Sequence, residues 1–169
     1  MKTKKIFIIA EAGVNHNGNL KIAKKLIREA SNSGVDAIKF QTFQASNLAT
    51  KNAKKAKYQI SKLDKDKKQY QMLKELELSK KMHFEYIKEF KKNNILFMSS
   101  AFDIKSFDFL LKLNLKIYKI PSGEITNLLL LKSIGQSRKK IILSTGMSNL
   151  IEIKDAIKIL LKSGTSKKN

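Results

Sequence analysis

Short apolar runs along this chain alternate with longer amphipathic stretches, and five of the runs end in a small polar cluster. The runs and the polar residues that follow them are residues 6–10 with Glu11, 37–40 with Gln41, 95–98 with Ser99 and Ser100, 116–120 with Ser122 to Glu124, and 141–143 with Ser144 and Thr145. Short apolar runs bounded by turn residues are typical of buried strands. Because polar residues at the carboxyl ends of parallel strands form the active site in α/β folds, the pattern predicts a site on one rim of the sheet.

The amphipathic stretches between the runs predict helices. Residues 19–33 repeat apolar side chains at the i, i+3, i+4, i+7 spacing of one buried face, and Gly34 follows as a helix stop. The predicted strands cover residues 5–10, 37–42, 95–99, 116–120 and 140–144, and the other predicted helices cover residues 67–78, 83–93, 104–113, 127–134 and 150–162. The long polar stretch 43–66 is expected to be a functional lid or disordered.

A strand–helix order repeated five times predicts an α/β fold with a parallel sheet in a single domain over residues 1–169. A closed barrel of eight strands typically needs about 200–250 residues. Two architectures therefore remain open at this point. One is a truncated TIM-type barrel with five of the eight βα units, and the other is a complete five-stranded doubly wound sheet.

The formal net charge is +21, which raises the possibility of a polyanionic partner. Arginine, whose planar fork reads nucleic acid bases, occurs only at Arg28 and Arg138, and the lysines are spread over every predicted helix. We therefore expect a solvated, lysine-rich surface and no nucleic acid partner. A nucleic-acid-binding protein is kept as the last of three functional hypotheses, and a strong salt dependence of binding would reveal it.

Nothing in the chain predicts export or membrane insertion. The apolar run 6–10 is shorter than the roughly 7–15 residues of an export signal, and no stretch reaches the roughly 18 apolar residues of a membrane span. The chain has no cysteine, so it can form neither a disulfide nor a thiolate metal site. These features favour a reducing cytoplasm and no membrane partner.

Two lysines occupy strand positions where charge is unusual. Lys39 and Gln41 alternate with apolar residues and share one face of the second strand, and Lys119 has a similar setting before Pro121. A lysine that points into a strand-lined interior is costly unless it meets an anion, so the pair suits a phosphate or carboxylate ligand. The alternative for Lys39 is an edge strand from which the lysine reaches solvent.

Hydroxyl and carboxyl groups at the strand ends extend this site. The serines at these ends supply donors, although each taken alone is an ordinary turn or cap residue. Glu11 and Glu124 can orient a polyhydroxylated substrate or move a proton, and the alternative is that each pairs with a nearby lysine. His16 lies in the loop after the first strand on the presumed active face, whereas His83 is expected to be exposed on a helix. Two isolated histidines form no complete metal site.

Five segments in order resemble the sialic acid synthase family of phosphoenolpyruvate-dependent synthases. They are residues 9–18 (IAEAGVNHNG), 38–41 (IKFQ), 99–103 (SSAFD), 119–124 (KIPSGE) and 142–147 (ILSTGM). The resemblance spans nearly the whole chain and implies the N-terminal part of a (β/α)8 barrel, with the later barrel units and the family's antifreeze-like domain absent. Residues 13–18, residues 54–59 and Pro121 look closer to the legionaminate branch of the family than to the sialate branch.

The resemblance implies condensation of phosphoenolpyruvate with an N-acyl amino sugar, either N-acetylmannosamine or a 2,4-diacetamido-trideoxyhexose. The product is a nine-carbon nonulosonic acid, and phosphate is released. Lys39, Glu11 and Glu124 take the catalytic roles by this resemblance. The implied substrate-binding residues are Asn15, His16, Gln41, Ser100, Lys119, Ser122 and Ser144. A divalent metal, manganese or magnesium, is expected for the full-length family enzyme, as is a homodimer.

The sequence departs from the family pattern in ways that bear on whether this chain is active. The family usually has Thr-Pro where this chain has Ser100-Ala101, and its metal-binding histidines lie in later strands, so no metal ligand is assigned here. The Lys-Lys-Asn ending at Asn169 suggests a slipped adenine tract or a premature stop, which the downstream DNA would test. We therefore expect the chain itself to be inactive. The alternative from another class is a catalytically dead module that binds phosphate or phosphoenolpyruvate, or one half of a split enzyme.

Overall fold

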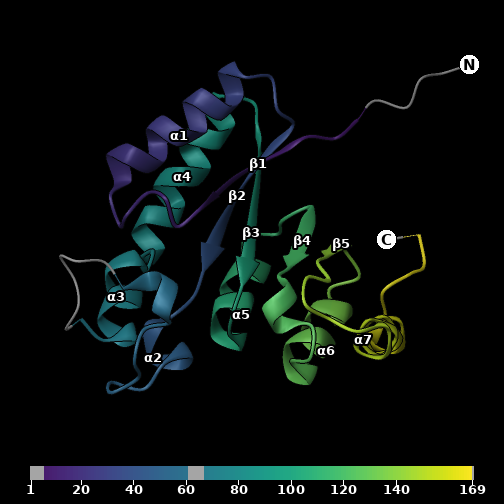
Figure 1. Cartoon of the computed structure of the whole chain (residues 1–169). Helices are drawn as coiled ribbons and strands as arrows, with labels where there is room; N and C mark the ends of the chain where they lie inside the picture. Colours follow the sequence, from purple (N-terminus) through teal and green to yellow (C-terminus); the bar gives the residue numbers. More distant parts are fainter. Residues whose placement is uncertain (1–5, 61–66, 169) are drawn as a thin grey trace, which may run out of the picture.

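A computed structural model describes residues 6–60 and 67–168 of the chain (Figure 1). The strands are β1 (Ile9–Gly13), β2 (Ala37–Thr42), β3 (Leu96–Ala101), β4 (Ile117–Ile120) and β5 (Lys140–Leu143). The helices are α1 (Leu20–Asn32), α2 (Ala45–Leu48), α3 (Gln69–Leu76), α4 (Lys80–Lys92), α5 (Ile104–Lys112), α6 (Leu128–Gln136) and α7 (Leu150–Ser163), with the 3-10 turns η1 (Lys57–Gln59) and η2 (Ser122–Glu124).

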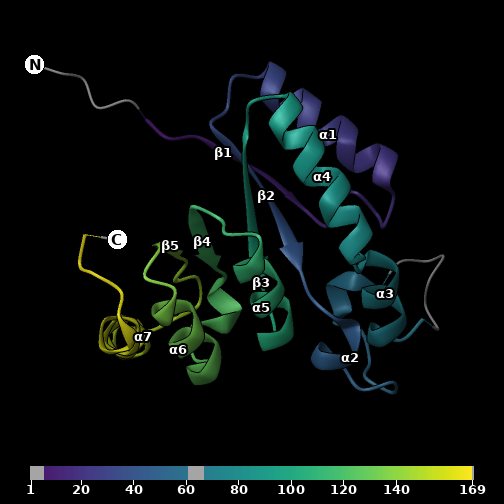
Figure 2. The ribbon, with the colours of Figure 1, turned by 180° about the vertical axis from the view of Figure 1, so that it is seen from behind.

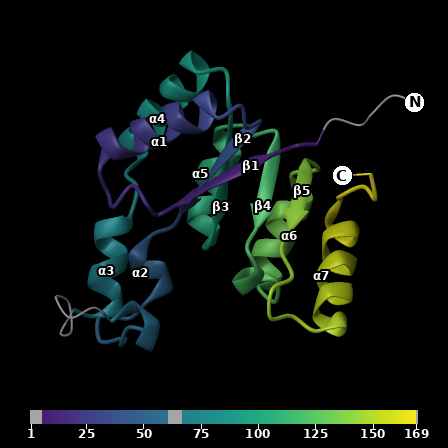
Figure 3. The same ribbon diagram turned by 45° about the horizontal axis from the view of Figure 1, so that its top comes forward.

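The strands form one parallel sheet in the order β1-β2-β3-β4-β5. A doubly wound sheet reverses its strand order at a switch point, whereas a barrel adds each strand beside the previous one. The consecutive order therefore excludes the doubly wound alternative and confirms five βα units of barrel type. Figure 3 shows β3, β4 and β5 side by side, with α7 at the end of the row beyond β5.

The hydrophobic core lies between one face of the sheet and the helices. Phe40, Phe97 and Tyr118 point from three neighbouring strands to this face and are at most 7% exposed. They join one apolar cluster with residues of α1, α4, α5, α6 and α7. The side chains that alternate with them along each strand point to the opposite face of the sheet, which we call the inner face. The candidate site lies on this inner face.

Local capping sets the start of most helices. Asn19 accepts hydrogen bonds from two backbone N–H groups at the start of α1. One backbone N–H group donates to each of the side chains that cap α4, α5 and α6, namely Ser79, Asp103 and Asn127. Asn149 and Glu152 form a reciprocal capping box on α7. The views in Figure 1 and Figure 2 both show α1 and α4 side by side, and Lys24 of α1 pairs with Glu85 of α4 at 2.9 Å.

The first strand differs from the prediction, which placed it at residues 5–10. β1 runs from Ile9 to Gly13, because β2 begins at Ala37 and its first register partner is Ile9. Ile6 is 78% exposed, so the apolar run begins before the sheet does. The strand instead extends through the polar Glu11.

The polar stretch 43–66 is ordered over part of its length. The structure describes α2 and η1 within it, and α2 contacts α3. Figure 1 shows both helices beyond the carboxyl end of β2. Residues 61–66 lie outside the described residues. Within the described ranges, no helix has the length and apolar content needed to cross a membrane.

Gly18 offers a test of how the loop after β1 is held. Its φ is +68°, and a Cβ there would lie 2.2 Å from the Glu75 backbone oxygen. Gly34 has a similar φ of +74°, with nothing within 4 Å of its Cβ position. We expect Gly34→Ala to cost about 1 kcal/mol from backbone strain alone, and Gly18→Ala to cost about 2 kcal/mol more, because α3 must move. Urea unfolding measures both, and equal costs would contradict the close approach.

Candidate active site

Polar side chains from neighbouring strands share the inner face of the sheet because of strand register. Glu11 of β1 is the register partner of Lys39 on β2, Gln41 is the partner of Ser100 on β3, and Ser100 is the partner of Lys119 on β4. Register partners in parallel strands point to the same side. We call Glu11, Lys39, Gln41, Ser100 and Lys119 the inner-face row. The sequence predicted all five as site residues, and the fold places them together.

Lys39 is buried in the middle of the sheet. Its side chain is 11% exposed, and its Nζ lies 2.7 Å from Glu11 Oε2. β2 pairs with strands on both sides, so the alternative of an edge-strand lysine reaching solvent is wrong. The alternative pairing of Glu11 with a nearby lysine is confirmed. Because the Glu11 side chain is 57% exposed, this ion pair is partly open to water and contributes little stability by itself.

The backbone of Gly13 lies beside both the Glu11 carboxylate and the Gln41 amide. A Cβ at Gly13 would lie 3.2 Å from Glu11 Oε1 and 3.6 Å from Gln41 Nε2, and the register shifts between Glu11 and Gly13. The φ of Gly13 is +52°, a conformation that a residue with a side chain adopts only with strain. Gly13 thus leaves open the space beside both of these polar groups.

Lys119 is the second ammonium group on the inner face. Its Nζ donates to Ser144 Oγ at 2.6 Å and to the Ile120 carbonyl at 2.8 Å. Burial lowers the pKa of Lys119, the neighbouring Lys39 ammonium lowers it further, and Glu11 partly opposes both. Since an ammonium group has three donors, Lys119 keeps one beyond these two hydrogen bonds.

Ser100 lies between the amide of Gln41 and the ammonium of Lys119 in the register. Ser100 is fully buried, and its Oγ has no hydrogen-bond partner within the described part of the chain. A buried hydroxyl without a partner costs about 1–3 kcal/mol. A ligand that accepts a hydrogen bond from Ser100 would recover that cost, and two lysines with one glutamate leave a net positive charge to attract it.

The turn after β4 brings two further predicted residues to the rim. Ser122 lies close to the loop after β5, because a Cβ on Gly146 would be 3.4 Å from Ser122 Oγ. Glu124 Oε2 accepts from Asn127 Nδ2 at 2.7 Å. Burial raises the pKa of Glu124, and Asp103 adds to this effect, while the hydrogen bond from Asn127 opposes it. Glu124 is therefore better suited to carrying a proton than an exposed glutamate.

His16 lies away from the inner-face row, although we expected it on the active face. Its ring is fully buried and lies 5.9 Å from that of Phe40 and 6.4 Å from that of Tyr86, centroid to centroid. Both neighbours belong to the helix-covered core, on the opposite face of β2 from Lys39. Asn15, the other predicted residue of this loop, is exposed.

The prediction that His83 is exposed is wrong, since only 1% of its surface is accessible. Its Nδ1 lies 3.0 Å from the Ser79 carbonyl, so Nδ1 carries the proton, and Nε2 accepts from the Thr42 hydroxyl at 2.9 Å. Thr42 in turn accepts from Ser99 at 2.7 Å. The reason for the difference is the face of α4 that packs on the sheet: it carries His83, Tyr86 and Phe90, whereas the neighbouring Phe84 is 53% exposed.

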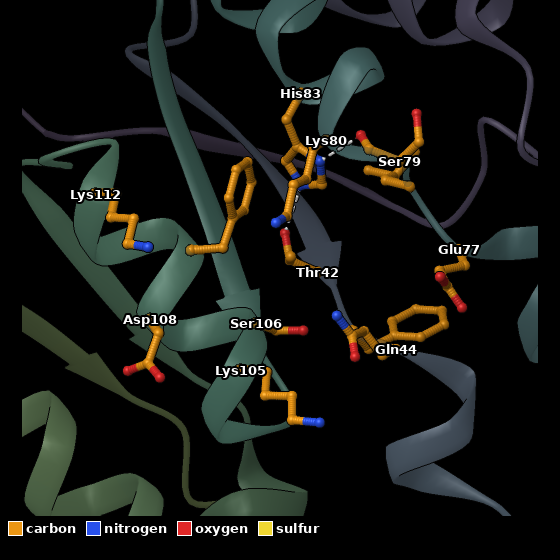
Figure 4. A pocket seen from close by; sticks show the side chains of 13 residues that line it. Thr42, Gln44, Glu77, Ser79, Lys80, His83, Lys105, Ser106, Asp108 and Lys112 are labelled. Atoms are coloured by element: carbon orange, nitrogen blue, oxygen red, sulfur yellow. Dashed lines mark hydrogen bonds between the residues drawn. The ribbon is translucent and has the colours of Figure 1, made fainter.

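A pocket of about 300 Å³ lies beside Thr42 and His83. Figure 4 shows the side chains that line it, among them Lys80, Lys105 and Lys112. The pocket lies on the helix side of the sheet, because Thr42 shares the face of Phe40. Its buried polar side chains, Thr42, His83 and Ser106, already have hydrogen-bond partners within the protein. Ser99, which we expected at the active rim, belongs to this side. Met98, which the prediction missed, is fully buried on the inner face as the register partner of Lys39.

Metal ligands do not gather in the described part of the chain. Over residues 6–60 and 67–168, no three His, Cys, Asp or Glu side chains lie close enough together to hold a metal ion. The residues described here therefore do not fit a manganese or magnesium site.

Comparison with known proteins gives consistent matches over nearly the whole chain. The NeuB family model matches residues 26–168. N,N'-diacetyllegionaminic acid synthase of Campylobacter jejuni is 55% identical, over 98% of this chain and 50% of that protein. The enzyme of the same name from Legionella pneumophila is 49% identical, over 89% of this chain and 42% of that protein.

A solved structure shares the fold. It is N-acetylneuraminic acid synthetase from Leptospira borgpetersenii in complex with citrate, with a TM-score of 0.80 and 31% sequence identity, covering 96% of this chain and 52% of that chain. The chain thus spans about half the length of the proteins it matches.

The buried His16 predicts a loss of stability in mild acid. Burial, with a smaller effect of His83, lowers the pKa of His16 to about 4 from an ordinary 6.5. Between pH 6.5 and pH 4, His16 is protonated in the unfolded chain but stays neutral in the folded chain. The free energy of unfolding therefore falls as the pH drops from 6.5 toward 4. We expect His16 to account for a loss of about 2 kcal/mol between pH 7.5 and 5.0.

Urea unfolding of the wild type and of His16→Phe at both pH values isolates this contribution, because the other titrating groups are common to both chains. The variant should lose about 2 kcal/mol less than the wild type over this interval. An equal loss would show that His16 is not buried in its neutral form.

Proposed function

The chain belongs to the NeuB family, and from this we propose that its inner-face row is the phosphoenolpyruvate-binding part of a nonulosonic acid synthase. The observation that carries the proposal is the combination of the buried Lys39, the half-buried Lys119 and an unpartnered buried hydroxyl, Ser100, on the same face of the sheet. Phosphoenolpyruvate carries a phosphate and a carboxylate, so it offers the negative charge and the acceptors that these groups lack.

The proposed reaction of the whole enzyme joins phosphoenolpyruvate to the open-chain form of an N-acyl amino sugar. C3 of the enol attacks the aldehyde carbon, forming the new C–C bond, and the aldehyde oxygen takes up a proton. Water adds at C2 and loses its proton, and phosphate leaves by cleavage of the C2–O bond. The relatives named as legionaminic acid synthases favour a diacetamido sugar as the acceptor.

Lys39 and Lys119 provide the charge that holds the anionic substrate. Each can donate to a phosphate or carboxylate oxygen, and such charge-assisted hydrogen bonds are about twice as strong as neutral ones. Ser100 supplies its free hydroxyl, and Ser144 positions the Lys119 ammonium through their 2.6 Å hydrogen bond. Ser122, on the rim, adds a further donor. Fixing the substrate on a rigid sheet lowers the entropic cost of the reaction.

Glu11, Gln41 and Glu124 are proposed to face the sugar. Gln41 and Glu11 both lie beside Gly13 and can hydrogen-bond to sugar hydroxyl or amide groups. Glu124, whose pKa is raised, is the best candidate for giving the proton to the aldehyde oxygen. We assign no step to a metal, since the described residues form no metal site.

A second candidate function is a module that binds phosphoenolpyruvate without catalysis. The described residues supply the anion-binding groups without a cluster of metal ligands. Binding and turnover therefore need separate tests.

Replacement of Lys119 tests the binding site. We expect Lys119→Met to weaken phosphoenolpyruvate binding by about 10- to 100-fold, the effect of losing one charge-assisted contact. Lys116→Met is the matched control, because Lys116 is exposed at the other end of the same stretch. Isothermal titration calorimetry measures both. Similar affinities for the two variants would place the ligand elsewhere.

The turnover test uses the purified chain with phosphoenolpyruvate, manganese and either N-acetylmannosamine or the diacetamido sugar. We expect binding without product, because the described residues hold no metal site. Mass spectrometry would detect a nonulosonic acid, and its appearance would show that the chain is catalytically sufficient.

A further inference from the structure

A buried network of hydrogen bonds lies behind the inner-face row, on the helix side of the sheet. The Ser99 hydroxyl donates to Thr42, and the Thr42 hydroxyl donates to His83 Nε2. On the other side of the ring, His83 Nδ1 donates to the Ser79 carbonyl. Figure 4 shows the ring between Ser79 and Thr42. We call His83, Thr42 and Ser99, each at most 5% exposed, the His83 network.

The His83 network runs in one direction. A backbone carbonyl can only accept, so Nδ1 carries the ring proton, and Nε2 of a neutral ring can only accept. Burial lowers the pKa of His83 from its ordinary 6.5, although the hydrogen bond to Ser79 opposes this, so the ring is neutral near pH 7. Thr42 therefore donates to the ring, and its oxygen is left to accept from Ser99.

Three elements hold the His83 ring in place. It projects from the start of α4, and its Nε2 contacts Thr42 at the end of β2. Phe109 of α5 lies edge-on to it, with ring centroids 4.9 Å apart and an interplanar angle of 77°. Because this packing and the two hydrogen bonds all oppose rotation of the ring, its acceptor nitrogen has a fixed position relative to the sheet.

The two hydroxyl residues of the His83 network are the sequence neighbours of two inner-face residues. Thr42 follows Gln41 on β2, and Ser99 precedes Ser100 on β3. Gln41 and Ser100 are themselves register partners across these strands. The hydrogen bond between Thr42 and Ser99 therefore joins β2 to β3 directly behind this pair.

The Ser100 side chain depends on the backbone of β3 for its position. The Lys119 ammonium is held by its hydrogen bond to Ser144, whereas the Ser100 hydroxyl has no partner in the described part of the chain. The path of β3 therefore decides where this hydroxyl lies. The adjacent Ser99 connects that path to α4 through the His83 network.

We propose that His83 is a positioning residue for the inner-face row. Through Thr42 and Ser99 it fixes the carboxyl ends of β2 and β3, so that the Gln41 amide and the Ser100 hydroxyl are in place before a ligand binds. Groups that are already ordered cost less entropy when the ligand arrives. The inference rests on the proposed function for the identity of that ligand, phosphoenolpyruvate.

Substitutions of Thr42 test the His83 network with little change in shape. Thr42→Val replaces the hydroxyl by a methyl group and removes both hydrogen bonds, whereas Thr42→Ser keeps the hydroxyl. Ser99→Ala is a milder variant that removes only the bond to Thr42. Ile134→Val controls for a small loss of core packing, because Ile134 is buried on α6, which packs against α5 and α7.

Two measurements are made on each variant under conditions where urea unfolding shows it to be folded. Isothermal titration calorimetry gives the affinity for phosphoenolpyruvate. Hydrogen exchange without ligand gives the exchange rates of the Gln41 and Ser100 amides. In the wild type, NMR of the His83 ring nitrogens shows which of them carries the proton.

We expect Thr42→Val to weaken phosphoenolpyruvate binding about tenfold and to speed exchange of both amides about tenfold, the effect of one lost hydrogen bond. Ser99→Ala should have smaller effects of the same kind, and it decides the matter if Thr42→Val does not fold. Thr42→Ser should stay close to the wild type, and Ile134→Val should change neither quantity. The wild-type ring should carry its proton on Nδ1.

The proposal is overturned if the Thr42→Val and Ser99→Ala variants match Ile134→Val, if affinity is unchanged despite faster exchange, or if Nε2 carries the proton. A wild type that does not bind phosphoenolpyruvate would instead contradict the proposed function. The exchange rates then decide the positioning role alone: faster exchange in Thr42→Val supports it, and unchanged exchange overturns it.

Discussion

The site depends on two lysines held on the same face of a parallel sheet, where their charges repel. The Lys39 ammonium contributes to lowering the pKa of Lys119, and burial of Lys119 contributes more. Glu11 offsets part of this repulsion through its contact with Lys39. Because these positions are set by backbone register, the sheet keeps them close without a bound ligand. An anion that contacts both ammonium groups is stabilised by their positive charges, which the fold holds in place before the anion binds.

The core makes this arrangement possible. Phe40 and Phe97, with Tyr118, pack against the helices, and the period of two in each strand then directs Lys39 and Ser100 to the other side. The same alternation separates Ser100 from Ser99, which joins Thr42 and His83 on the helix side. Of these two adjacent residues of β3, Ser100 therefore belongs to the candidate site and Ser99 to the helix side of the sheet.

Much of this could be predicted from the sequence because apolar runs and strand periodicity are local signals. β2 was predicted with its observed bounds, and alternation gave Lys39 and Gln41 a shared face. Glu11 and Ser100 were predicted as residues just beyond their strands, whereas the structure places both inside β1 and β3. The setting of His83 could not be predicted, since it depends on which face of α4 packs against the sheet and on a hydrogen bond to a distant residue, Thr42. His16 was misplaced because loop geometry, and not a repeat, turns its ring into the core.

The central claim is that phosphoenolpyruvate binds on the inner face between Lys39 and Lys119. The most direct test is a crystal structure of the chain with phosphoenolpyruvate bound. We predict that oxygen atoms of the ligand lie within hydrogen-bond distance of both ammonium groups and of the Ser100 hydroxyl. Ligand density in the pocket beside His83 and Lys80, with none on the inner face, would contradict the account.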